Sequence, residues 1–318
     1  MKRRQFLQST TACGAGMTMS LSASALNQLV AAPADGFPEL STFAFESVTA
    51  DRRGRVIAQQ THEARYFTEM LNESERLDMI AIDGSQAMVG TTDAGCGTGT
   101  YEYAPQCINV EPLYLGRTAV TQDQWRAVAA LPSVSRELAL EPACFTGGDH
   151  PVECVSWHDA QEFCDRLSVN SGREYRLPTE AEWEAACRAG TTSAFHVGAT
   201  VTSELANYSA LHVYDTEQRG AYPRRTIPVA QFAPNAHGLY DMHGNVWEWC
   251  ADAWQDSFRD RGAKASDDYN GRRALRGGSW ADAPMKLRSA SRTGYAADSL
   301  NRIIGFRIAL SLRPGRQA

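Results

Sequence analysis

The fold of this chain is limited most by the loss of helical periodicity after residue 190. Glycine, asparagine, proline and aromatic residues dominate there, as in residues 228–235 and 238–250, and four of the seven tryptophans lie between residues 247 and 280. Backbone of this composition does not continue as regular helix, so we predict short strands and long, well-packed loops. Loops that bury indole rings often need an ion to hold their carbonyl groups.

Three helix starts before residue 190 share one capping pattern. They lie at Thr121, Ser156 and Thr179, each followed three residues later by Gln, Asp or Glu. In a capping box the Ser or Thr oxygen accepts a hydrogen bond from a free backbone N–H, and the later residue caps back. We therefore predict three amphipathic helices. Cys164 and Cys187 fall on their apolar stripes and are interpreted as buried small hydrophobic residues.

The composition is that of an ordinary globular protein. The chain has 318 residues, 31 basic and 37 acidic side chains and a net charge of −6, and 43% of its residues are hydrophobic. These values exclude wholesale disorder, a collagen and a polytopic membrane protein. The acidic balance gives no reason to expect nucleic acid as a partner, because phosphate binding needs a basic surface.

Residues 1–34 have the pattern of an export signal. Residues 2–4 are cations, and a weakly apolar, alanine- and serine-rich stretch without charge follows as far as Asp35. Paired arginines at this place resemble the twin-arginine class. The stretch is too polar for a membrane span, which needs about 20 strongly apolar residues. We predict a periplasmic, cell-surface or secreted protein, with lipidation at Cys13 as a less favoured alternative.

Seven of the eight cysteines remain after residue 34. Seven is odd, so at least one cysteine stays unpaired within the chain. Cys144 and Cys154 bracket one glycine-rich turn, and Cys96 and Cys107 bracket another. Spacing does not determine connectivity, so both pairings stay open.

The mature chain is divided into three parts. Residues 35–76 are interpreted as an N-terminal appendage, because residues 43–49 alternate like a strand and a turn follows. The main domain is assigned to residues 77–312, beginning with a strand over 77–90, and residues 313–318 form a tail.

Five motifs in this domain resemble the formylglycine-generating enzyme, or sulfatase-modifying factor, family. They are PVECVSW at 151–157, YRLPTEAEW at 175–183, GLYDMHGNVWEW at 238–249, LRGGSW at 275–280 and GFR at 305–307. They occur in the family's order over most of the mature chain. The resemblance implies an irregular α+β fold related to C-type lectins, with little regular secondary structure.

The family's oxidase needs two cysteines shortly after its Arg-Gly-Gly-Ser motif. The resemblance implies that these thiolates bind Cu(I), a metal that thiolates select, and that dioxygen then oxidises a substrate cysteine to formylglycine. Residues 279–288 contain no cysteine. Asp282 and Met285 are the nearest candidates, and Met285 is interpreted as a packing or surface residue. The segment argues against copper and against sulfatase activation.

The resemblance also implies a calcium site built from a side-chain oxygen, two backbone carbonyls and a glutamate. The matching positions are Asp241, Gly244, Val246 and Glu248. Oxygen ligands on a tight, glycine-containing turn suit Ca²⁺, and the alternative is that the two acids are capping or salt-bridged residues. A second family site would begin at Asn207 and Tyr208, but its partner carboxylate has no clear counterpart near Ala221. The histidines show no His-x-x-x-His spacing, and no nucleophile elbow or phosphate-binding loop is present.

Residues 280–304 alternate between a fixed-looking frame and miscellaneous residues. The candidate ligand-binding residues are Trp280, Ala281, Asp282, Ala283, Lys286, Ser291, Thr293, Tyr295, Ala296, Ser299, Arg302 and Ile303. This alternation resembles the variable proteins of diversity-generating retroelements, some of which use the same lectin-like fold. In that system, asparagine codons in a template are mutated at adenines. Such changes can produce Ala, Asp, Ser, Thr, Tyr and Ile, but not the lysine found at position 286.

Two functions remain open, and so does the question whether the protein is an enzyme. The first is an exported family member without the copper-binding cysteine pair, which binds a protein or small-molecule ligand through residues 280–304. The alternative is a periplasmic oxidoreductase of the sulfatase-modifying-factor or pyoverdine-maturation type with different chemistry. The first rests on the expectation that no two unpaired thiols, such as Cys187 and Cys250, meet beneath Trp280.

Overall fold

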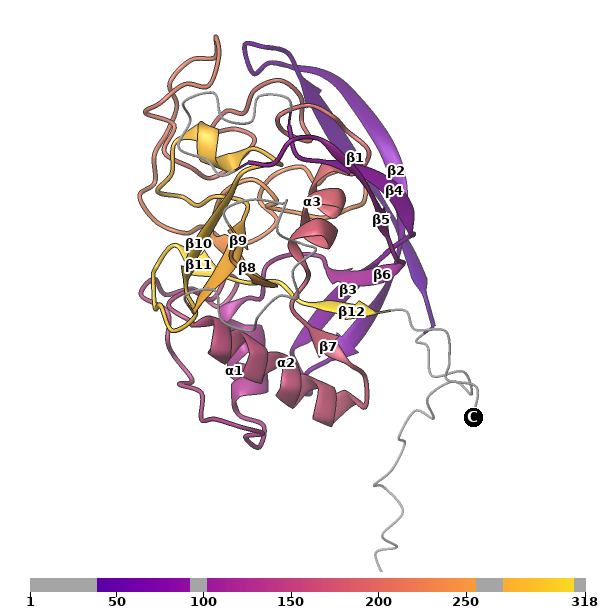
Figure 1. Cartoon of the computed structure of the whole chain (residues 1–318), viewed down its shortest axis with the longest axis vertical. Coiled ribbons are helices and arrows are strands. Elements are labelled where there is room, and N and C mark those ends of the chain that lie inside the picture. Colours follow the sequence, from indigo (N-terminus) through magenta and orange to yellow (C-terminus); the bar gives the residue numbers. More distant parts are fainter. Residues whose placement is uncertain (1–38, 92–101, 256–270, 312–318) are drawn as a thin grey trace, which may run out of the picture. The chain divides into compact units, whose positions relative to one another are not determined.

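Figure 1 shows a computed structural model of the chain, which describes residues 39–91, 102–255 and 271–311. The chain divides into two units after Pro38, and the fold belongs to the second unit, Glu39–Ala318. Cys96 and the segments assigned to the export signal and the tail lie outside the described residues, so those assignments stay predictions.

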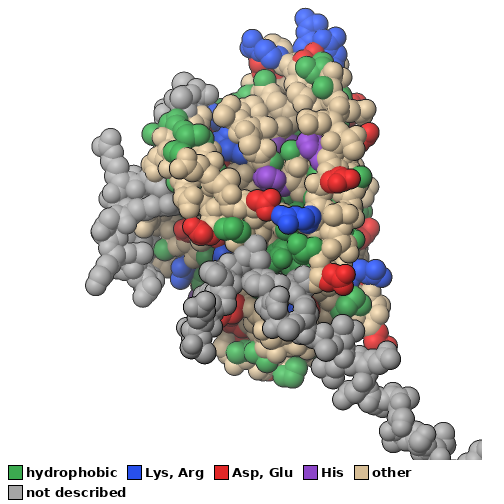
Figure 2. Space-filling view, turned by 90° about the vertical axis from the view of Figure 1, so that its right-hand side faces the viewer, with side chains coloured by type: hydrophobic (Ala, Val, Ile, Leu, Met, Phe, Trp, Pro, Cys, Tyr) green, Lys and Arg blue, Asp and Glu red, His purple; other side chains and the backbone are tan. Residues whose placement is uncertain are grey.

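The largest sheet is antiparallel throughout. Its order is β1 (Ser41–Ala50), β2 (Val56–Met70), β3 (Arg76–Ile82), β6 (Leu113–Gly116), β12 (Ala309–Ser311) and β7 (Tyr175–Arg176). Residues 35–76, interpreted as an appendage, thus contribute two of its strands, one of them the edge. The outer face of β1 and β2 faces the viewer in Figure 2, where acidic and basic side chains are interspersed over the coloured surface.

Two smaller sheets complete the strands of the described residues. The four-stranded sheet has the order β10 (Arg292–Ala296), β9 (Arg272–Arg276), β8 (Trp247–Ala253) and β11 (Ile304–Gly305). β4 (Ser85–Val89) pairs with β5 (Gln106–Val110). The strand predicted over residues 77–90 is therefore wrong as one element: it breaks at Gly84, where a Cβ atom would come within 2.7 Å of Pro112 Cδ.

The three capping boxes form as predicted. Thr121 caps α1 (Gln122–Ala129), Ser156 caps α2 (Trp157–Ser171) and Thr179 caps α3 (Glu180–Arg188). α2 ends at Gly172 in the left-handed conformation, as expected of a C-terminal glycine. In α3 that role falls to Ala189, one residue before the predicted Gly190. None of the helices in the described part of the chain is long and apolar enough to cross a membrane.

α3 packs between the two larger sheets (Figure 1). One hydrophobic cluster joins Trp183 and Cys187 of α3 to Ile80 of β3 and to Cys250 and Ala274 of the four-stranded sheet. A second cluster joins α1 and α2 to the six-stranded sheet, with Cys164 among its buried members. Cys164 and Cys187 are 0% exposed, which confirms their interpretation as core residues. The mixed α+β architecture confirms the predicted fold class, and after residue 190 the described strands are short, with at most seven residues in β8.

Candidate functional site

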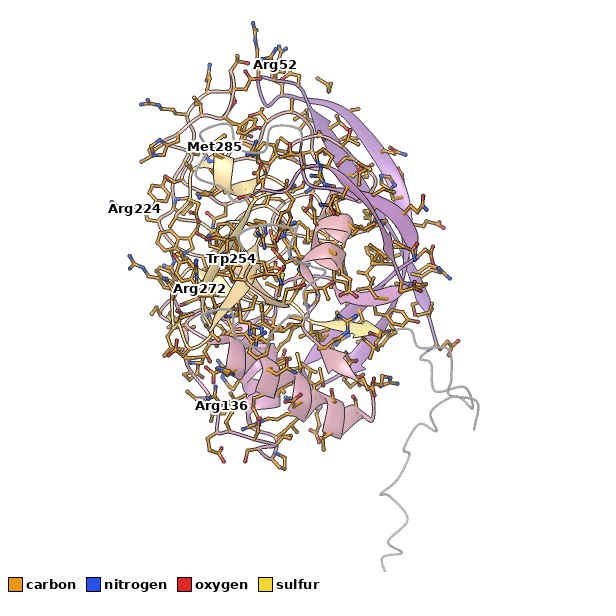
Figure 3. The ribbon with its side chains drawn as sticks, in the orientation of Figure 1. Arg52, Arg136, Arg224, Trp254, Arg272 and Met285 are labelled. Atoms are coloured by element: carbon orange, nitrogen blue, oxygen red, sulfur yellow. The ribbon has the colours of Figure 1, made fainter. Side chains whose placement is uncertain are left out.

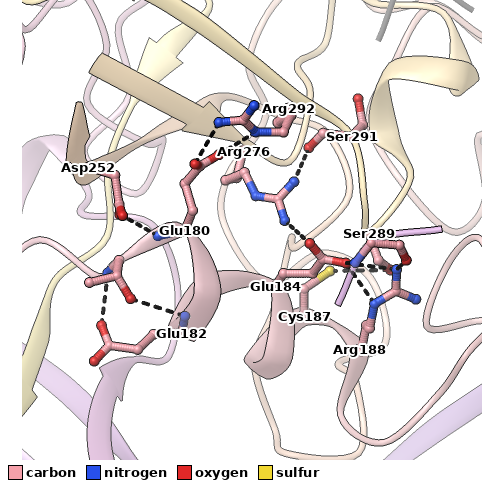
Figure 4. Close-up of polar contacts among 12 residues, drawn as sticks. Glu180, Glu182, Glu184, Cys187, Arg188, Asp252, Arg276, Ser289, Ser291 and Arg292 are labelled. Atoms are coloured by element: carbon pink, nitrogen blue, oxygen red, sulfur yellow. Dashed lines mark hydrogen bonds and ion pairs between the residues drawn. The ribbon is translucent and has the colours of Figure 1, made fainter. Parts of the chain in front are cut away.

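Buried ion pairs join α3 to the four-stranded sheet (Figure 4). Glu180 Oε2 lies 2.7 Å from Arg292 Nη2, and Glu184 pairs with both Arg276 and Arg188. Arg276 and Arg292 are at most 2% exposed. Removing one partner of such a pair strands a buried charge, so these side chains fix the position of the sheet.

The candidate ligand-binding residues fall into three groups by exposure. Ala281, Ala296 and Arg302 are exposed, whereas Trp280 and Ser291 are 4% and 0% exposed. The half-buried group is Asp282, Ala283, Lys286, Thr293, Tyr295, Ser299 and Ile303. Ser291 therefore lies in the core rather than on a binding surface, and its carbonyl accepts a hydrogen bond from Arg276. Met285 is half-buried on the short 3₁₀ helix Pro284–Leu287 (Figure 3).

Asp282 is part of the frame rather than an interchangeable residue. Its Oδ2 atom accepts hydrogen bonds from Trp247 Nε1 at 2.8 Å and from the Ser279 backbone N–H at 3.1 Å, and also from the Ser279 hydroxyl. Burial raises the pKa of the Asp282 carboxyl group. A substitution here would release Trp247 and the turn after Ser279, so Asp282 is unsuited to a test of ligand affinity alone.

Three aromatic rings from distant segments, those of Phe145, Tyr222 and Trp280, lie together. The Phe145 ring lies edge-on to Trp280 with centroids 5.5 Å apart, and Tyr222 stacks at 6.4 Å. Phe145 and Tyr222 are half-buried, so they cover Trp280 and present the outer surface of the group.

One arginine side chain lies over each of the three rings. The guanidinium carbon of Arg224 lies 5.8 Å from the Tyr222 centroid, Arg225 lies 5.6 Å from Phe145, and Arg302 lies 5.5 Å from Trp280. All three arginines are exposed, and Arg224 extends at the left-hand margin of the side chains drawn in Figure 3. Cation–π contacts of this kind are worth about 0.5–1 kcal/mol at exposed sites. We call these residues, Phe145, Tyr222, Arg224, Arg225, Trp280 and Arg302, the aromatic patch.

Sequence analysis found Trp280 and Arg302 but missed the other members of the patch. Tyr222, Arg224 and Arg225 stand together in one Tyr-Pro-Arg-Arg stretch, a signal that local inspection could have singled out. Phe145 carried no such signal, because only the folding of residues 144–154 brings it to Trp280.

A thiol pair adjoins the aromatic patch. Cys144 Sγ and Cys154 Sγ lie 3.0 Å apart. Cys144 precedes Phe145, and the Cys154 backbone N–H donates to the Asn301 carbonyl at 3.1 Å. This is one of the two pairings that the sequence left open, and the expectation that no two unpaired thiols meet beneath Trp280 stays a prediction. The pair comes from Cys144 and Cys154, whereas Cys187 is occupied in the core by contacts to His243 and Ser289.

The residues expected to bind calcium differ in how far their side-chain oxygen atoms are already engaged in hydrogen bonds or ion pairs. Asp241 Oδ2 accepts a hydrogen bond from the Ala230 N–H at 2.7 Å, and desolvation raises the pKa of Asp241 to about 6. Asn207 is 3% exposed, and no donor in the described part of the chain reaches its Oδ1 atom. Glu248, by contrast, is held by Arg307 at 2.6 and 2.7 Å and by Trp183 Nε1 at 2.6 Å. Asp241 and Asn207 fit a hard cation, whereas Glu248 would have to share its oxygens.

The other expected positions shape the turn rather than the ligand set. Gly244 has φ +98°, and a Cβ atom there would lie 2.4 Å from the Asn207 carbonyl oxygen. Val246 donates its backbone N–H to Gly244 and is 2% exposed. The Tyr208 hydroxyl donates to the Val201 carbonyl at 2.9 Å, in the interior.

Two of the scattered histidines form a buried stacked pair. His196 and His243 stack with centroids 4.7 Å apart, and among the described residues neither ring nitrogen of His196 has a hydrogen-bond partner. The one described group that could hold a metal ion through three His, Cys, Asp or Glu side chains is instead Cys144, Glu153 and Cys154.

Burial of His196 predicts acid sensitivity. Desolvation, followed by the effect of His243, holds the pKa of His196 well below 6.5, so the folded state keeps the ring neutral. The stability that this contributes is complete above the unfolded pKa and is lost as pH falls below about 6.5. We expect the melting temperature of the unaltered protein to fall more steeply between pH 7 and pH 5 than that of His196→Phe. Exposed His212→Asn is the control, and parallel curves for all three proteins would contradict the argument.

The comparisons with known proteins agree with this geometry. Residues 67–312 match the family model described as the sulfatase-modifying factor enzyme 1-like domain. The formylglycine-generating enzyme of Mus musculus is 34% identical over 181 residues, which cover 52% of this chain and 45% of that protein. The chain spans between 26% and 55% of the length of the first curated relatives it matches.

Two solved structures share the fold over most of their length. Treponema denticola variable protein 1 superposes with a TM-score of 0.63 and 27% identity, over 78% of this chain and 99% of that one. PvdO from Pseudomonas aeruginosa gives a TM-score of 0.64 and 27% identity, over 77% and 98%. With its five motifs in order, its two sheets around α3 and this family match over residues 67–312, the chain belongs to the sulfatase-modifying factor, or formylglycine-generating enzyme, family.

Proposed function

We propose that this protein binds an acidic ligand or protein partner through the aromatic patch. The observation that carries the proposal is the set of three exposed arginines, each lying over one of three rings in contact. Tryptophan, tyrosine and arginine dominate the energetics of protein interfaces. The rings are rigid, so binding orders few torsions, and a guanidinium matches a carboxylate with two parallel hydrogen bonds.

Charge supports the acidic class of partner. The chain as a whole carries a net charge of −6, so the three arginines are a local exception and not a consequence of a basic protein. Arg225 and Arg302 take part in no ion pair with a described residue, which leaves both guanidinium groups available to a partner. The similarity to a variable protein supports a role in binding.

A binding assay tests the proposal. A peptide of alternating glutamate and tyrosine should bind in a calorimetric titration, and the matching lysine–tyrosine peptide should not. Affinity should fall as salt rises, because exposed charges are screened over about 10 Å at 0.1 M ionic strength. Equal binding of both peptides, or none of the acidic one, would exclude an acidic partner.

A second candidate, an oxidoreductase, is favoured by the Cys144–Cys154 pair and by the similarity to PvdO. It predicts dioxygen consumption by the purified protein in the presence of a substrate. Loss of that activity in Cys144→Ser, with peptide binding intact, would separate the two functions.

We also propose a calcium ion at the turn that contains Asp241, whereas Asn207 belongs to the second, separate family site. When bound, the ion would supply positive charge that stiffens the loops under the aromatic patch. The desolvated Asp241 carboxyl group on this turn supports it.

Calcium removal should lower the melting temperature. An ion at 100 times its dissociation constant stabilises by about 2.7 kcal/mol, which corresponds to about 5–10 °C for a domain of this size. Asp241→Asn should lose this response to a chelator, because it keeps an acceptor for the Ala230 N–H but not the charge. Exposed Asp298→Asn is the matched control. An unchanged melting curve in chelator would contradict calcium binding.

A further inference from the structure

The most unusual chemical group outside the aromatic patch is the cluster of Cys144, Glu153 and Cys154. Their ligand atoms all lie within 4.8 Å of one another. Cys144 is exposed and Cys154 is half-buried, so one thiol faces solvent and the other faces the protein.

Glu153 is a buried acid with unused hydrogen-bonding capacity. It is 0% exposed, and its Oε1 atom accepts the Phe145 N–H at 2.8 Å. Among the described residues, no nitrogen or oxygen atom donates to its Oε2 atom and no cation forms an ion pair with it. A buried carboxylate without a cation is costly, so its place beside two thiols calls for a chemical role.

The backbone around the cluster is tightly determined. Cys154 has φ +59°, a left-handed backbone conformation that is uncommon for residues other than glycine and asparagine. Its N–H donates to Asn301, and the Phe145 carbonyl accepts from Gln122 Nε2 at 2.7 Å. These bonds tie each end of the 144–154 loop to another segment, and the bond from the Phe145 N–H to Glu153 joins the two ends to each other.

We propose that Cys144 and Cys154 are a dithiol–disulfide site, in which Cys144 reacts with an external disulfide and Glu153 accepts the proton of the Cys154 thiol. The site would exchange electrons with a small-molecule or protein disulfide that reaches the exposed Cys144.

The steps balance as thiol–disulfide exchange. The Cys144 thiolate attacks the external disulfide, forms a mixed disulfide and releases one thiol of the oxidant. The Cys154 thiol then passes its proton to Glu153 Oε2 as its sulfur attacks Cys144 Sγ. The second oxidant thiolate leaves and takes up that proton. Two protein thiols are oxidised to one disulfide, and one external disulfide is reduced to two thiols.

The environment assigns the two cysteines different roles. Burial, together with the neighbouring Cys144 and Glu153, raises the pKa of the Cys154 thiol, so Cys154 is a poor first nucleophile and needs a base in contact. The Phe145 N–H donates a hydrogen bond to Glu153, and the Cys154 N–H donates one to the Asn301 carbonyl. The thiol pair, whose redox state would change, therefore lies at the edge of the aromatic patch.

Oxidised glutathione tests the site in the full chain. The reduced protein should lose two thiols to one intramolecular disulfide, seen as a mass decrease of about 2 Da and assigned by peptide mapping to Cys144 and Cys154. Cys154→Ser should stop at the mixed disulfide on Cys144. Glu153→Gln should close the disulfide at least tenfold more slowly from the mixed disulfide, because a positioned base contributes about 10²–10⁴-fold. The melting temperature of Glu153→Gln should not fall, which a merely structural role would not predict.

Three results would overturn the proposal: no disulfide between these residues, closure by Glu153→Gln at the unaltered rate, or exclusive metal binding. The last is checked by adding Zn²⁺ to the reduced protein. One tightly bound ion that is lost in both Cys144→Ser and Glu153→Gln, together with no disulfide after oxidation, would show a metal site instead. Peptide binding by the aromatic patch is measured separately, so failure of the thiol chemistry leaves that proposal standing.

Discussion

Replacing Arg225 and Arg302 together with alanine is expected to weaken binding of the glutamate–tyrosine peptide at least 30-fold. Both guanidinium groups are exposed and lie over the Phe145 and Trp280 rings, where a bound carboxylate could engage them. Interface arginines of this kind cost about 2 kcal/mol or more when truncated, and 2 kcal/mol corresponds to about 30-fold in affinity. Titration calorimetry at one fixed ionic strength measures the effect.

The fold should tolerate this double substitution. Neither side chain forms an ion pair with a described residue, and the structural bonds at these positions come from backbone carbonyls. The Arg225 carbonyl accepts from Asn207 Nδ2, and the Arg302 carbonyl accepts from Trp280 Nε1. The melting temperature should therefore fall by no more than about 2–8 °C, since the two exposed cation–π contacts are worth about 0.5–1 kcal/mol each.

Arg53→Ala is the matched control, because Arg53 is an exposed arginine whose side chain has no described partner. It should bind the peptide as the unaltered chain does. An equal loss in Arg53→Ala would mean that the peptide responds only to net charge. No loss in the double variant would place the binding surface elsewhere.

Local signals in the sequence predicted the helices well. The capping boxes at Thr121, Ser156 and Thr179 depend on residues three positions apart, so a linear pattern contains all the information they need. The apolar stripes likewise placed Cys164 and Cys187 in the core. The resemblance supplied the rest of the fold class, since loops without periodicity carry no comparable signal.

The candidate site was predictable only where one segment forms it. The alternation in residues 280–304 suggested a binding surface, but Ser291 is buried. It directly precedes β10, which pairs with β9, and its backbone carbonyl accepts a hydrogen bond from Arg276. The aromatic patch joins Phe145, Tyr222 and Trp280, which are brought together by loop packing alone. Spacing in the sequence left two cysteine pairings open. In the structure, the sulfurs of Cys144 and Cys154 are in contact, next to a left-handed turn at Cys154.

Glu248→Gln is expected to lower the melting temperature by about 10 °C. Glu248 is 1% exposed, and it neutralises Arg307, which also donates to the carbonyls of Gly116 and Tyr240. Breaking a buried pair by removing one partner costs about 3–5 kcal/mol, because the remaining charge is stranded. For a domain of this size each kcal/mol corresponds to about 2–4 °C, which scanning calorimetry resolves readily.

An exposed ion pair provides the control. Arg65 and Asp83 lie 2.6 Å apart with side chains 54% and 84% exposed, and such pairs contribute little because water and salt screen them. Asp83→Asn should therefore change the melting temperature by less than about 2 °C. A shift in Glu248→Gln as small as that of Asp83→Asn would contradict a structural role for the Glu248–Arg307 pair.

The same variant separates the two roles that Glu248 could have. If Glu248 serves only Arg307, its substitution lowers stability equally in calcium and in chelator, while Asp241→Asn alone abolishes the response to calcium. If Glu248 also binds the ion, Glu248→Gln loses the calcium response as well as the ion-pair stability. Because Arg307 already occupies both carboxylate oxygens, the first pattern is the expected one, with Asp241 as the ligand whose charge calcium neutralises.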